Sequence, residues 1–469
     1  MTNITHRLGL VEPRVRPVLD PQFRPAVLAV RAFQDLVRST GAGVPVRLAI
    51  EQADGSVFRF ETAVLPETHP QAAVNAVNLE RFVKFLLWSR GGWRIHVDGP
   101  APLVAQLAAH YRDTDTGRFD AHLVAERMFD HPLEVVRTQE LPEERSVTKP
   151  LGRHLDGCRI GFDLGGSDRK VAAVIDGRVV FSEEIVWDPY HQPDPAYHYD
   201  GLMDSLTRAA AHLPRVDAIG GSAAGVYVNN RVKAGSLFRG VPPDVFAARV
   251  RDIFLDVRKA WGNVPFEVVN DGEVTALAGS MSLGANAILG IALGTSTAGG
   301  YVTADGNITS WLNELAFVPV DYSPSAPVDE WSGDYGVGSQ YFSQQCVGRL
   351  VGVAGIEAAP GMPLPEQLKL VQTLMADGDA RAADIYRTIG AYLGYGVAHF
   401  ASFYDVQHVL VLGRVTSGTG GDLIIGGARE VLAAEFPDLT RQIAFHVPDE
   451  HDKRHGQAVA AASLPEIPA

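Results

Sequence analysis

Two segments of the chain share a pattern of residues that can bind phosphate. Residues 161–180 read GFDLGGSDRKVAAVIDGRVV, and residues 290–309 read GIALGTSTAGGYVTADGNIT, an ungapped repeat at an offset of 129 residues. Each predicts an apolar strand, a turn of small residues, a second apolar strand and an Asp-Gly turn. Small residues let backbone N–H groups converge on an anion. One copy alone favours a plain hairpin turn; two copies in the same frame favour a nucleotide site.

A carboxylate lies between the two copies, in the stretch VPFEVVNDGEVTALAG. Residues 266–269 predict a short buried strand, and a helix is expected from about Glu273. Asp271 is therefore either the N-cap of that helix or a carboxylate at the carboxyl end of a strand, where open α/β sheets bind ligands, and both can hold. When a hydroxyl attacks a phosphoryl group, such a carboxylate is suited to be the general base.

A third loop rich in small residues follows near the C-terminus. Residues 381–403 predict an amphipathic helix and residues 406–413, VQHVLVLG, a buried strand; the loop RVTSGTGGD comes directly after it. Its glycines allow a flat ring or a ribose to approach the backbone closely. A flexible connection without a ligand is the alternative that the sequence leaves open.

Length and composition limit the scaffold that positions these motifs. A chain of 469 residues is long enough for two to four lobes. Its two cysteines, Cys158 and Cys346, form no Cys-x-x-Cys pair, which argues against a disulfide framework or a thiolate zinc site. No apolar run is long enough to cross a bilayer and no secretion signal is recognisable, so we expect a cytoplasmic protein without a membrane partner.

Charge is distributed unevenly along the chain. The net charge is -14, yet residues 1–150 carry 18 Lys and Arg against 18 Asp and Glu, so the acidic excess lies after residue 150. Nucleic-acid surfaces need clustered Lys and Arg. We therefore expect no nucleic-acid partner.

A polar linker predicts a domain boundary near residue 150. The segment 137–157, RTQELPEERSVTKPLGRHLDG, lacks a sustained apolar period. Before it, residues 46–65 predict a hairpin that turns at Asp54–Gly55, and helices and a strand follow over residues 78–111. The expected domains are an accessory α/β domain of unknown role at 1–150 and two lobes at 151–285 and 286–469. Whether the last helix returns to the first lobe is left open.

Taken in order, DLGGS, VVNDG, LGTSTAGG and VLVLGRVTSG resemble the sugar kinases of the hexokinase-actin-Hsp70 superfamily, and in particular the ROK family of repressors, uncharacterised reading frames and kinases. The resemblance covers about residues 159–463. It implies a two-lobed, actin-like (ribonuclease H-like) α/β fold with duplicated mixed-sheet lobes, here with the additional N-terminal α/β domain. It also implies Mg-ATP in a cleft between the lobes, a small carbohydrate substrate and a homodimer.

The resemblance assigns roles to individual residues. Asp271 matches the catalytic base, and Asp163 would lie near the magnesium ion and the γ-phosphate. Substrate contacts would come from Asn270, Glu314 and Ser236. The remaining matched positions would contact the nucleotide: Gly165, Gly166 and Ser167 in the first turn, Gly294, Thr295 and Ser296 in the second, and Gly413, Gly418 and Gly420 beside the adenosine.

The chain departs from the family at the sugar side of the site. Phe317 stands where a histidine is expected, and the expected cysteine positions hold Glu330, Ser332 and Val337. Because a structural zinc site needs four nitrogen or sulfur ligands, we predict that no zinc is bound. A sugar-gripping glutamate is replaced by Ser339. These losses mean that a glucose-type specificity cannot be carried over.

The second turn also carries fewer glycines than its family counterpart, and Arg414 follows Gly413 where a second glycine is usual. The sequence therefore predicts an ATP-dependent kinase for a hydroxyl of a sugar or sugar derivative. It leaves open a catalytically silent carbohydrate sensor or scaffold on the same fold and, as a weaker alternative, a ROK-type transcriptional regulator.

Overall fold

The computed structural model describes residues 10–146, 151–447 and 450–468. The chain divides into two compact units that do not follow simple sequence order. Unit 1 comprises Met1–Val147, Ile291–Gly299 and Trp311–Val447; unit 2 comprises Thr148–Gly290, Gly300–Ser310 and Pro448–Ala469. The domain boundaries expected at residues 150 and 285 stay predictions. Among the described residues, no helix has the length and apolar character needed to span a membrane.

Unit 2 is built on a five-stranded mixed sheet in the order β11-β8-β5-β6-β7. Strands β11, β8 and β5 are parallel, and β6 and β7 continue the sheet in antiparallel pairing. The strands span Cys158–Leu164 (β5), Asp168–Ile175 (β6), Arg178–Val186 (β7), Ala218–Ala223 (β8) and Phe266–Asn270 (β11).

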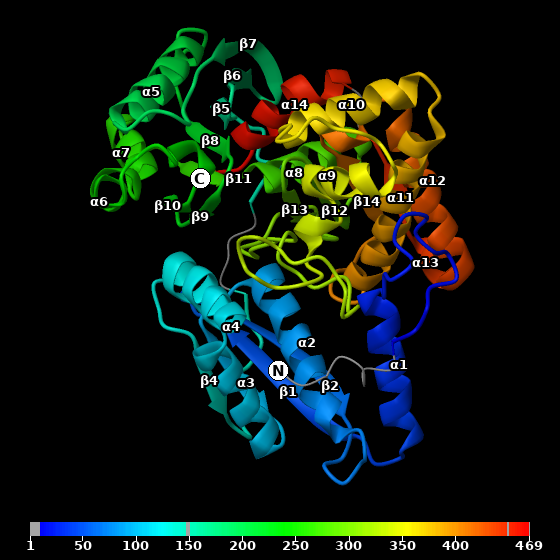
Figure 1. Cartoon of the computed structure of the whole chain (residues 1–469). Coiled ribbons are helices and arrows are strands. Elements are labelled where there is room, and N and C mark those ends of the chain that lie inside the picture. Colours follow the sequence, from blue (N-terminus) through cyan, green and yellow to red (C-terminus); the bar gives the residue numbers. More distant parts are fainter. Residues whose placement is uncertain (1–9, 147–150, 448–449, 469) are drawn as a thin grey trace. The chain divides into compact units, whose positions relative to one another are not determined.

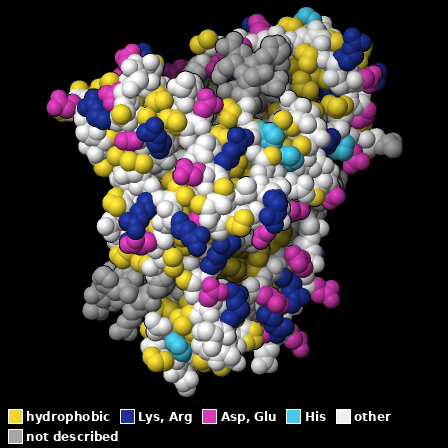
Figure 2. All heavy atoms as spheres, turned by 90° about the vertical axis from the view of Figure 1, so that its right-hand side faces the viewer, with side chains coloured by type: hydrophobic (Ala, Val, Ile, Leu, Met, Phe, Trp, Pro, Cys, Tyr) yellow, Lys and Arg dark blue, Asp and Glu magenta, His cyan; other side chains and the backbone are white. Residues whose placement is uncertain are grey.

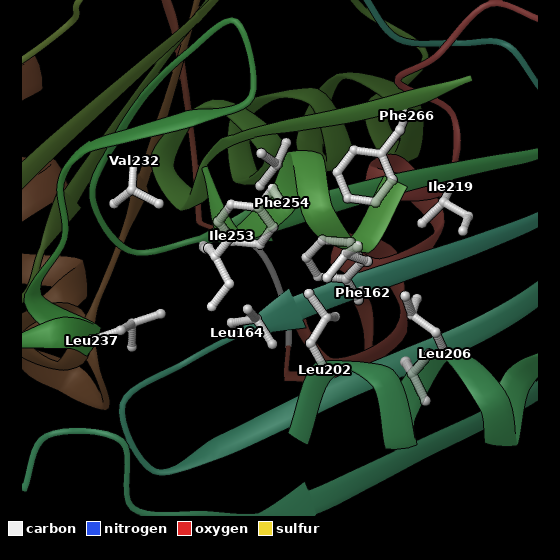
Figure 3. Packing of buried hydrophobic residues seen from close by; sticks show 14 of the residues in the cluster. Phe162, Leu164, Leu202, Leu206, Ile219, Val232, Leu237, Ile253, Phe254 and Phe266 are labelled. Carbon is white, nitrogen blue, oxygen red and sulfur yellow. The ribbon is translucent and has the colours of Figure 1, made fainter. Parts of the chain in front are cut away.

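Helices cover both faces of this sheet. Figure 3 shows the apolar core on one face, where Phe162 of β5 faces Leu202 and Leu206 of α5 and Phe254 of α7. On the other face lie α8 and α14, the latter beside β5 and β6 in Figure 1. A Cβ added to Gly161 would lie 1.7 Å from a carbonyl oxygen of α14, which gives that glycine a packing role. The helices span Ala196–Ala210 (α5), Ile253–Ala260 (α7), Asp271–Leu283 (α8) and Glu450–Ala462 (α14).

A small subdomain of unit 2 connects β8 to β11. It contains a two-stranded hairpin of β9 and β10 and a series of short helices. Its elements are Val226–Val228 (β9), Arg231–Ala234 (β10), Ser236–Phe238 (η4), Pro243–Val245 (α6), Phe246–Val250 (η5) and α7.

Residues 26–137 form a four-stranded sheet in the order β2-β1-β3-β4 with helices packed on it. The hairpin predicted at Asp54–Gly55 is confirmed, because β1 and β2 pair antiparallel and Gly55 takes a positive φ of 85°. The strands are Val44–Glu51 (β1), Val57–Val64 (β2), Arg94–Asp98 (β3) and Glu134–Arg137 (β4). The helices are Ala26–Ser39 (α1), Ala72–Val74 (η2), Asn75–Arg90 (α2), Ala101–Asp113 (α3), Asp115–Asp120 (α4) and Ala121–Met128 (η3).

A second mixed sheet, in the order β13-β12-β14-β15, contains the two strands of the second repeat copy, β12 and β13. Its strands are Ile288–Leu293 (β12), Thr297–Val302 (β13), His408–Leu412 (β14) and Ala444–His446 (β15). The helices of this region are Gly338–Gln340 (η6), Gln344–Val353 (α9), Leu364–Ala376 (α10), Ala380–Phe400 (α11), Arg414–Thr416 (η7), Thr419–Glu435 (α12) and Pro437–Gln442 (α13).

The repeat is confirmed as two hairpins of the same design. The turn of the first joins β5 to β6, and the turn of the second joins β12 to β13. The predicted fold class, α/β with duplicated mixed sheets and an additional N-terminal α/β region, is confirmed as well.

Candidate active site

Two carboxylates of unit 2 lie at the carboxyl end of its parallel strands. Asp163 is opposite Ser222 in the pairing of β5 with β8, and Asn270 is opposite Ala223 in the pairing of β8 with β11. Asp271 directly follows β11, so only β8 separates its strand from that of Asp163. This edge is the usual ligand-binding edge of an open α/β sheet.

The start of α8 decides between the two roles predicted for Asp271. Asn270, with extended backbone, is the N-cap: its side chain accepts from the N–H of Gly272 at 2.7 Å, and Asp271 is the first residue of the helix. The N-cap interpretation of Asp271 is therefore wrong. Its carboxylate also accepts from the N–H of Gly272, at 3.0 Å.

Burial raises the pKa of both carboxylates. Asp163 is only 5% exposed, and burial raises its pKa, which Lys170 opposes. Burial, and after it the charge of Asp163, raises the pKa of Asp271 to about 6. Two neighbouring carboxylates with raised pKa values are a common mark of a functional site.

Lys170 is a site residue that the sequence interpretation missed. Its Nζ lies 3.4 Å from an oxygen of Asp163 and 3.1 Å from an oxygen of Asp168. The hairpin register places Lys170 directly opposite Asp163, so counting across the predicted turn was the signal that could have found it. The ammonium group of Lys170 therefore compensates part of the negative charge of the buried Asp163 carboxylate.

The first turn is closed by the N–H of Gly165, which donates to the carbonyl of Asp168 at 2.9 Å. Among the residues that the structure describes, no acceptor is recorded for the N–H groups of Gly166 and Ser167. Two adjacent N–H groups without an internal acceptor fit an anion such as phosphate.

Gly166 also has a packing reason to be glycine. A Cβ there would lie 2.0 Å from the hydroxyl of Tyr190. The same turn is supported by Trp187, whose indole N–H donates to the carbonyl of Gly165 at 2.8 Å. Packing therefore accounts for this glycine, and its contact with a phosphate stays a prediction.

The second turn, in unit 1, repeats this arrangement. The N–H of Gly294 donates to the carbonyl of Ser296 at 3.1 Å, and no acceptor is recorded for the N–H groups of Thr295 and Ser296 within the described ranges. The carbonyl of Gly294 accepts from the N–H of Gln344, at the start of α9. The backbone of this turn can thus offer N–H groups to an anion in the same way.

The glycines predicted beside the adenosine differ in what surrounds them. A Cβ on Gly413 would lie 2.4 Å from a carbonyl oxygen of Leu293, and one on Gly420 would lie 2.5 Å from the ring of Tyr386. Packing alone therefore requires these two glycines. Gly418 precedes α12. Apart from its chain neighbours, no described residue has a heavy atom within 4 Å of a Cβ placed on it, so its surface is open to a ligand.

The three predicted substrate contacts lie in different settings. Asn270 already uses its side chain: besides capping α8, it donates to the carbonyl of Gly225 at 2.6 Å. Ser236 is exposed at the start of η4, in unit 2. Glu314 lies in unit 1, and its N–H donates to the carbonyl of Trp88 at the end of α2.

The stretch that contains Glu330, Ser332 and Val337 aligns with the zinc motif of the family that the sequence resembles. In this chain it contacts α2 of the N-terminal region. Arg81 and Lys84 of α2 pair with Asp334 at 2.9 and 3.0 Å, and Lys84 also pairs with Asp120 at 2.8 Å. Phe317, at the expected histidine position, packs its ring 4.3 Å from that of Trp88.

Ionisation within this buried cluster is strongly perturbed. Burial opposes charge on Asp334, but Arg81 and Lys84 outweigh it and hold its pKa well below the usual range. No group of three or more potential metal ligands occurs among the described residues. The ion pairs of Asp334 and the packing of Phe317 on Trp88 join this stretch to α2.

Comparison with solved structures identifies the fold. A ROK hexokinase from Thermus thermophilus matches with a TM-score of 0.51 and 18% identity, over 65% of this chain and 97% of its own. A ROK family transcriptional regulator, a homolog of the E. coli MLC protein, matches with a TM-score of 0.53 and 17% identity, over 83% of this chain and 96% of its own. The chain has the ROK fold. A ROK glucokinase from Streptomyces griseus, solved with glucose and AMPPNP, gives a TM-score of 0.48 and 21% identity, over 65% of this chain and 98% of its own.

The resemblance to ROK proteins that the sequence motifs suggested is thus confirmed at the level of the fold. No protein-family model and no curated protein matches the sequence. The match to the regulator covers 83% of this chain, which is more than residues 148–469 contain. It therefore extends into residues 1–147. At these identities the ROK fold does not assign an activity, which has to be argued from the site.

Proposed function

We propose that the chain is an ATP-dependent kinase that phosphorylates a hydroxyl group of a sugar or sugar derivative. The observation that carries this proposal is the pair Asp163 and Asp271 at the carboxyl edge of the unit 2 sheet, with the pKa of Asp271 raised to about 6. A carboxylate that titrates near neutrality is well suited to take up and release a proton. The ROK hexokinase that shares the fold supports the choice of reaction.

In the proposed reaction, Asp271 accepts the proton of the acceptor hydroxyl. The hydroxyl oxygen forms a bond to the γ-phosphorus of ATP while the bond from that phosphorus to the bridging oxygen breaks, which releases ADP. The free N–H groups of Gly166 and Ser167 would donate to phosphate oxygens. Lys170 would neutralise part of the charge near Asp163.

The residues present fit a magnesium ion and a nucleotide. Asp163 offers a buried carboxylate, and carboxylate together with phosphate oxygens is the coordination that Mg²⁺ prefers. Mg²⁺, when bound, would supply charge neutralisation on the phosphates. The proposed catalytic base does not depend on the ion for its own raised pKa, because burial is the main cause.

The test is an ATP-consumption screen over hexoses, amino sugars, acylated sugars and polyols, followed by Asp271→Asn. We expect turnover to fall by about 10²–10⁴-fold, with Mg-ATP affinity by calorimetry nearly unchanged. In the wild type, kcat/KM should fall about tenfold per pH unit below about 6, because the base must be ionised.

Asp256→Asn on α7, an exposed aspartate, is the matched control and should behave as the wild type. Full turnover by Asp271→Asn would contradict the assignment of the base.

A specific observation also favours a catalytically silent sensor on the same fold. The ammonium of Lys170 lies against Asp163, the residue that is expected to face the metal ion, and Tyr190 covers Gly166. A site filled by its own side chains would bind a sugar without Mg-ATP. Calorimetry with Mg-ATP at millimolar concentrations separates the two proposals, because the kinase requires binding and the sensor does not.

The weaker regulator alternative would need a basic surface for nucleic acid. Figure 2 shows Lys and Arg interspersed with Asp and Glu on the face that it displays, rather than gathered into one basic field. The mixed charge on this one face and the neutral charge of residues 1–150 give the regulator no specific support.

A further inference from the structure

Arg239 of unit 2 contacts an aromatic ring rather than a carboxylate. Others in this unit, among them Arg208, Arg215 and Arg231, pair with a carboxylate. Arg239 is exposed, and within the described ranges it has no ion pair. Its guanidinium carbon instead lies 3.9 Å from the centre of the Tyr190 ring. Its charge is therefore available to a ligand.

Tyr190 connects this guanidinium to the first turn. Its hydroxyl lies against Gly166, since a Cβ at that residue would approach it to 2.0 Å. A Cβ on Gly240 would lie 2.8 Å from the carbonyl oxygen of Tyr190, so the chain after Arg239 is packed closely against the segment that carries the ring. Arg239 thus lies one aromatic ring away from the backbone of the first turn.

The element that carries Arg239 is firmly anchored. Leu237 and Phe238 of η4 are 0% and 3% exposed, and they belong to the same apolar core as Leu164 at the end of β5. Figure 3 shows Leu237 and Leu164 within this cluster. The carbonyl of Leu237 also contacts the ring nitrogen of His198 at 2.9 Å. This anchoring holds the backbone next to Arg239 in place, and the contact with the Tyr190 ring restrains the guanidinium itself.

A stacked, planar guanidinium is suited to bind a carboxylate or phosphate through two parallel hydrogen bonds. A neutral sugar requires no such cation. An anionic sugar, in contrast, would be repelled by Asp163 and Asp271, and a nearby arginine would offset that repulsion. Arg239 also lies three residues after Ser236, the predicted substrate contact, and its backbone N–H donates to the carbonyl of Ser236 at 3.2 Å.

We infer that Arg239 binds an anionic group of the phosphoryl acceptor, so that the substrate class is a sugar acid or a sugar phosphate. This inference rests on the proposed kinase function, because it takes the η4 region as the acceptor side of the site. It makes Arg239 a specificity-determining residue.

Calorimetry without ATP tests the inference, with glucose, glucuronate and glucose 6-phosphate as probes. We expect glucuronate or glucose 6-phosphate to bind the wild type more tightly than glucose does. Arg239→Gln should weaken that binding about tenfold or more, since hydrogen bonds to charged groups are the stronger ones. Arg239→Lys, which keeps the charge but not the planar fork, should give a smaller loss.

Arg215→Gln is the matched control, because this exposed arginine lies before β8, at the opposite end of the sheet from Asp271, and its partner is Asp217. It should bind all three probes as the wild type does. Unchanged binding of the anionic probes by Arg239→Gln would overturn the inference, as would a preference of the wild type for glucose.

A loss of Mg-ATP affinity in Arg239→Gln, with the anionic probe unaffected, would also overturn it by assigning the arginine to the nucleotide. An ATP-consumption assay with the same probes separates the two proposals. Binding of an anionic probe that depends on Arg239, without ATP consumption, would contradict the kinase and leave the anion site standing.

Discussion

Two clusters of buried charge in this protein are organised in opposite ways. In unit 1, Arg81 and Lys84 lie among Glu80, Asp120 and Asp334, with most of the charges in direct ion pairs. In unit 2, Asp163 and Asp271 share one nearby cation, Lys170, which contacts only the first of them. The pKa of Asp334 is lowered, whereas the pKa of Asp271 is raised to about 6.

The difference indicates which cluster serves stability and which serves chemistry. Paired charges without solvent access favour one conformation, because separating them leaves an uncompensated buried charge. Unmatched carboxylates cost stability and are retained where a proton or a cation has to be bound. Three variants test this comparison.

The largest expected effect is on the unit 1 cluster. Lys84→Met removes the ammonium that bridges Asp120 and Asp334, both buried, and should lower the free energy of unfolding by about 3–5 kcal/mol. Urea unfolding followed by circular dichroism measures the change. Lys259→Met, at an exposed position of α7, should leave stability within about 0.5 kcal/mol of the wild type. Equal stability of the two variants would remove the distinction between the clusters.

Asp271→Asn should instead raise the free energy of unfolding at neutral and alkaline pH. The folded-state pKa of Asp271 is raised from 3.8 to about 6, so this carboxyl group contributes stability below about pH 4 and loses that contribution as the pH rises through 6. At pH 8 the variant should therefore be more stable than the wild type, by about 1–3 kcal/mol. The gain should vanish near pH 4 in the same urea experiment. A loss of stability at pH 8 would show that Asp271 is structural.

The smallest expected effect is that of Lys170→Met. Loss of the ammonium leaves Asp163 less compensated, which should raise its pKa further and weaken binding of the triphosphate about tenfold. Mg-ATP calorimetry measures the affinity, and the free energy of unfolding should change by no more than about 1 kcal/mol, because Lys170 is partly exposed. If affinity rose instead, the ammonium would be an occupant of the metal position, as the sensor proposal requires.

The sequence was sufficient for the local parts of the site. The two hairpins were predicted from glycine, serine and Asp-Gly positions, because turn chemistry is decided by residues that are neighbours in sequence. Asp271 was placed at the start of a helix for the same reason. The sequence left its N-cap role open, and that alternative was wrong. Asn270 and Asp271 are both good caps, and only the backbone conformation distinguishes them.

Contacts over long sequence distances could not be predicted in this way. Tyr190 needed the path of a loop that passes over Gly166. Arg81 bonds to Asp334 across 253 residues, and nothing in either local sequence indicates the other. The N-terminal region was accordingly expected to be an accessory domain, although α2 holds the 312–334 stretch of the same unit.

The sequence by itself determined the elements of this protein: alternating apolar strands, small-residue turns, and a carboxylate at the end of a strand. These follow from local sterics and periodicity. Only the tertiary structure decided which charges are compensated. The pKa of a buried carboxylate depends on its solvent access and on the charges within a few ångströms, and in this chain those charges come from distant segments.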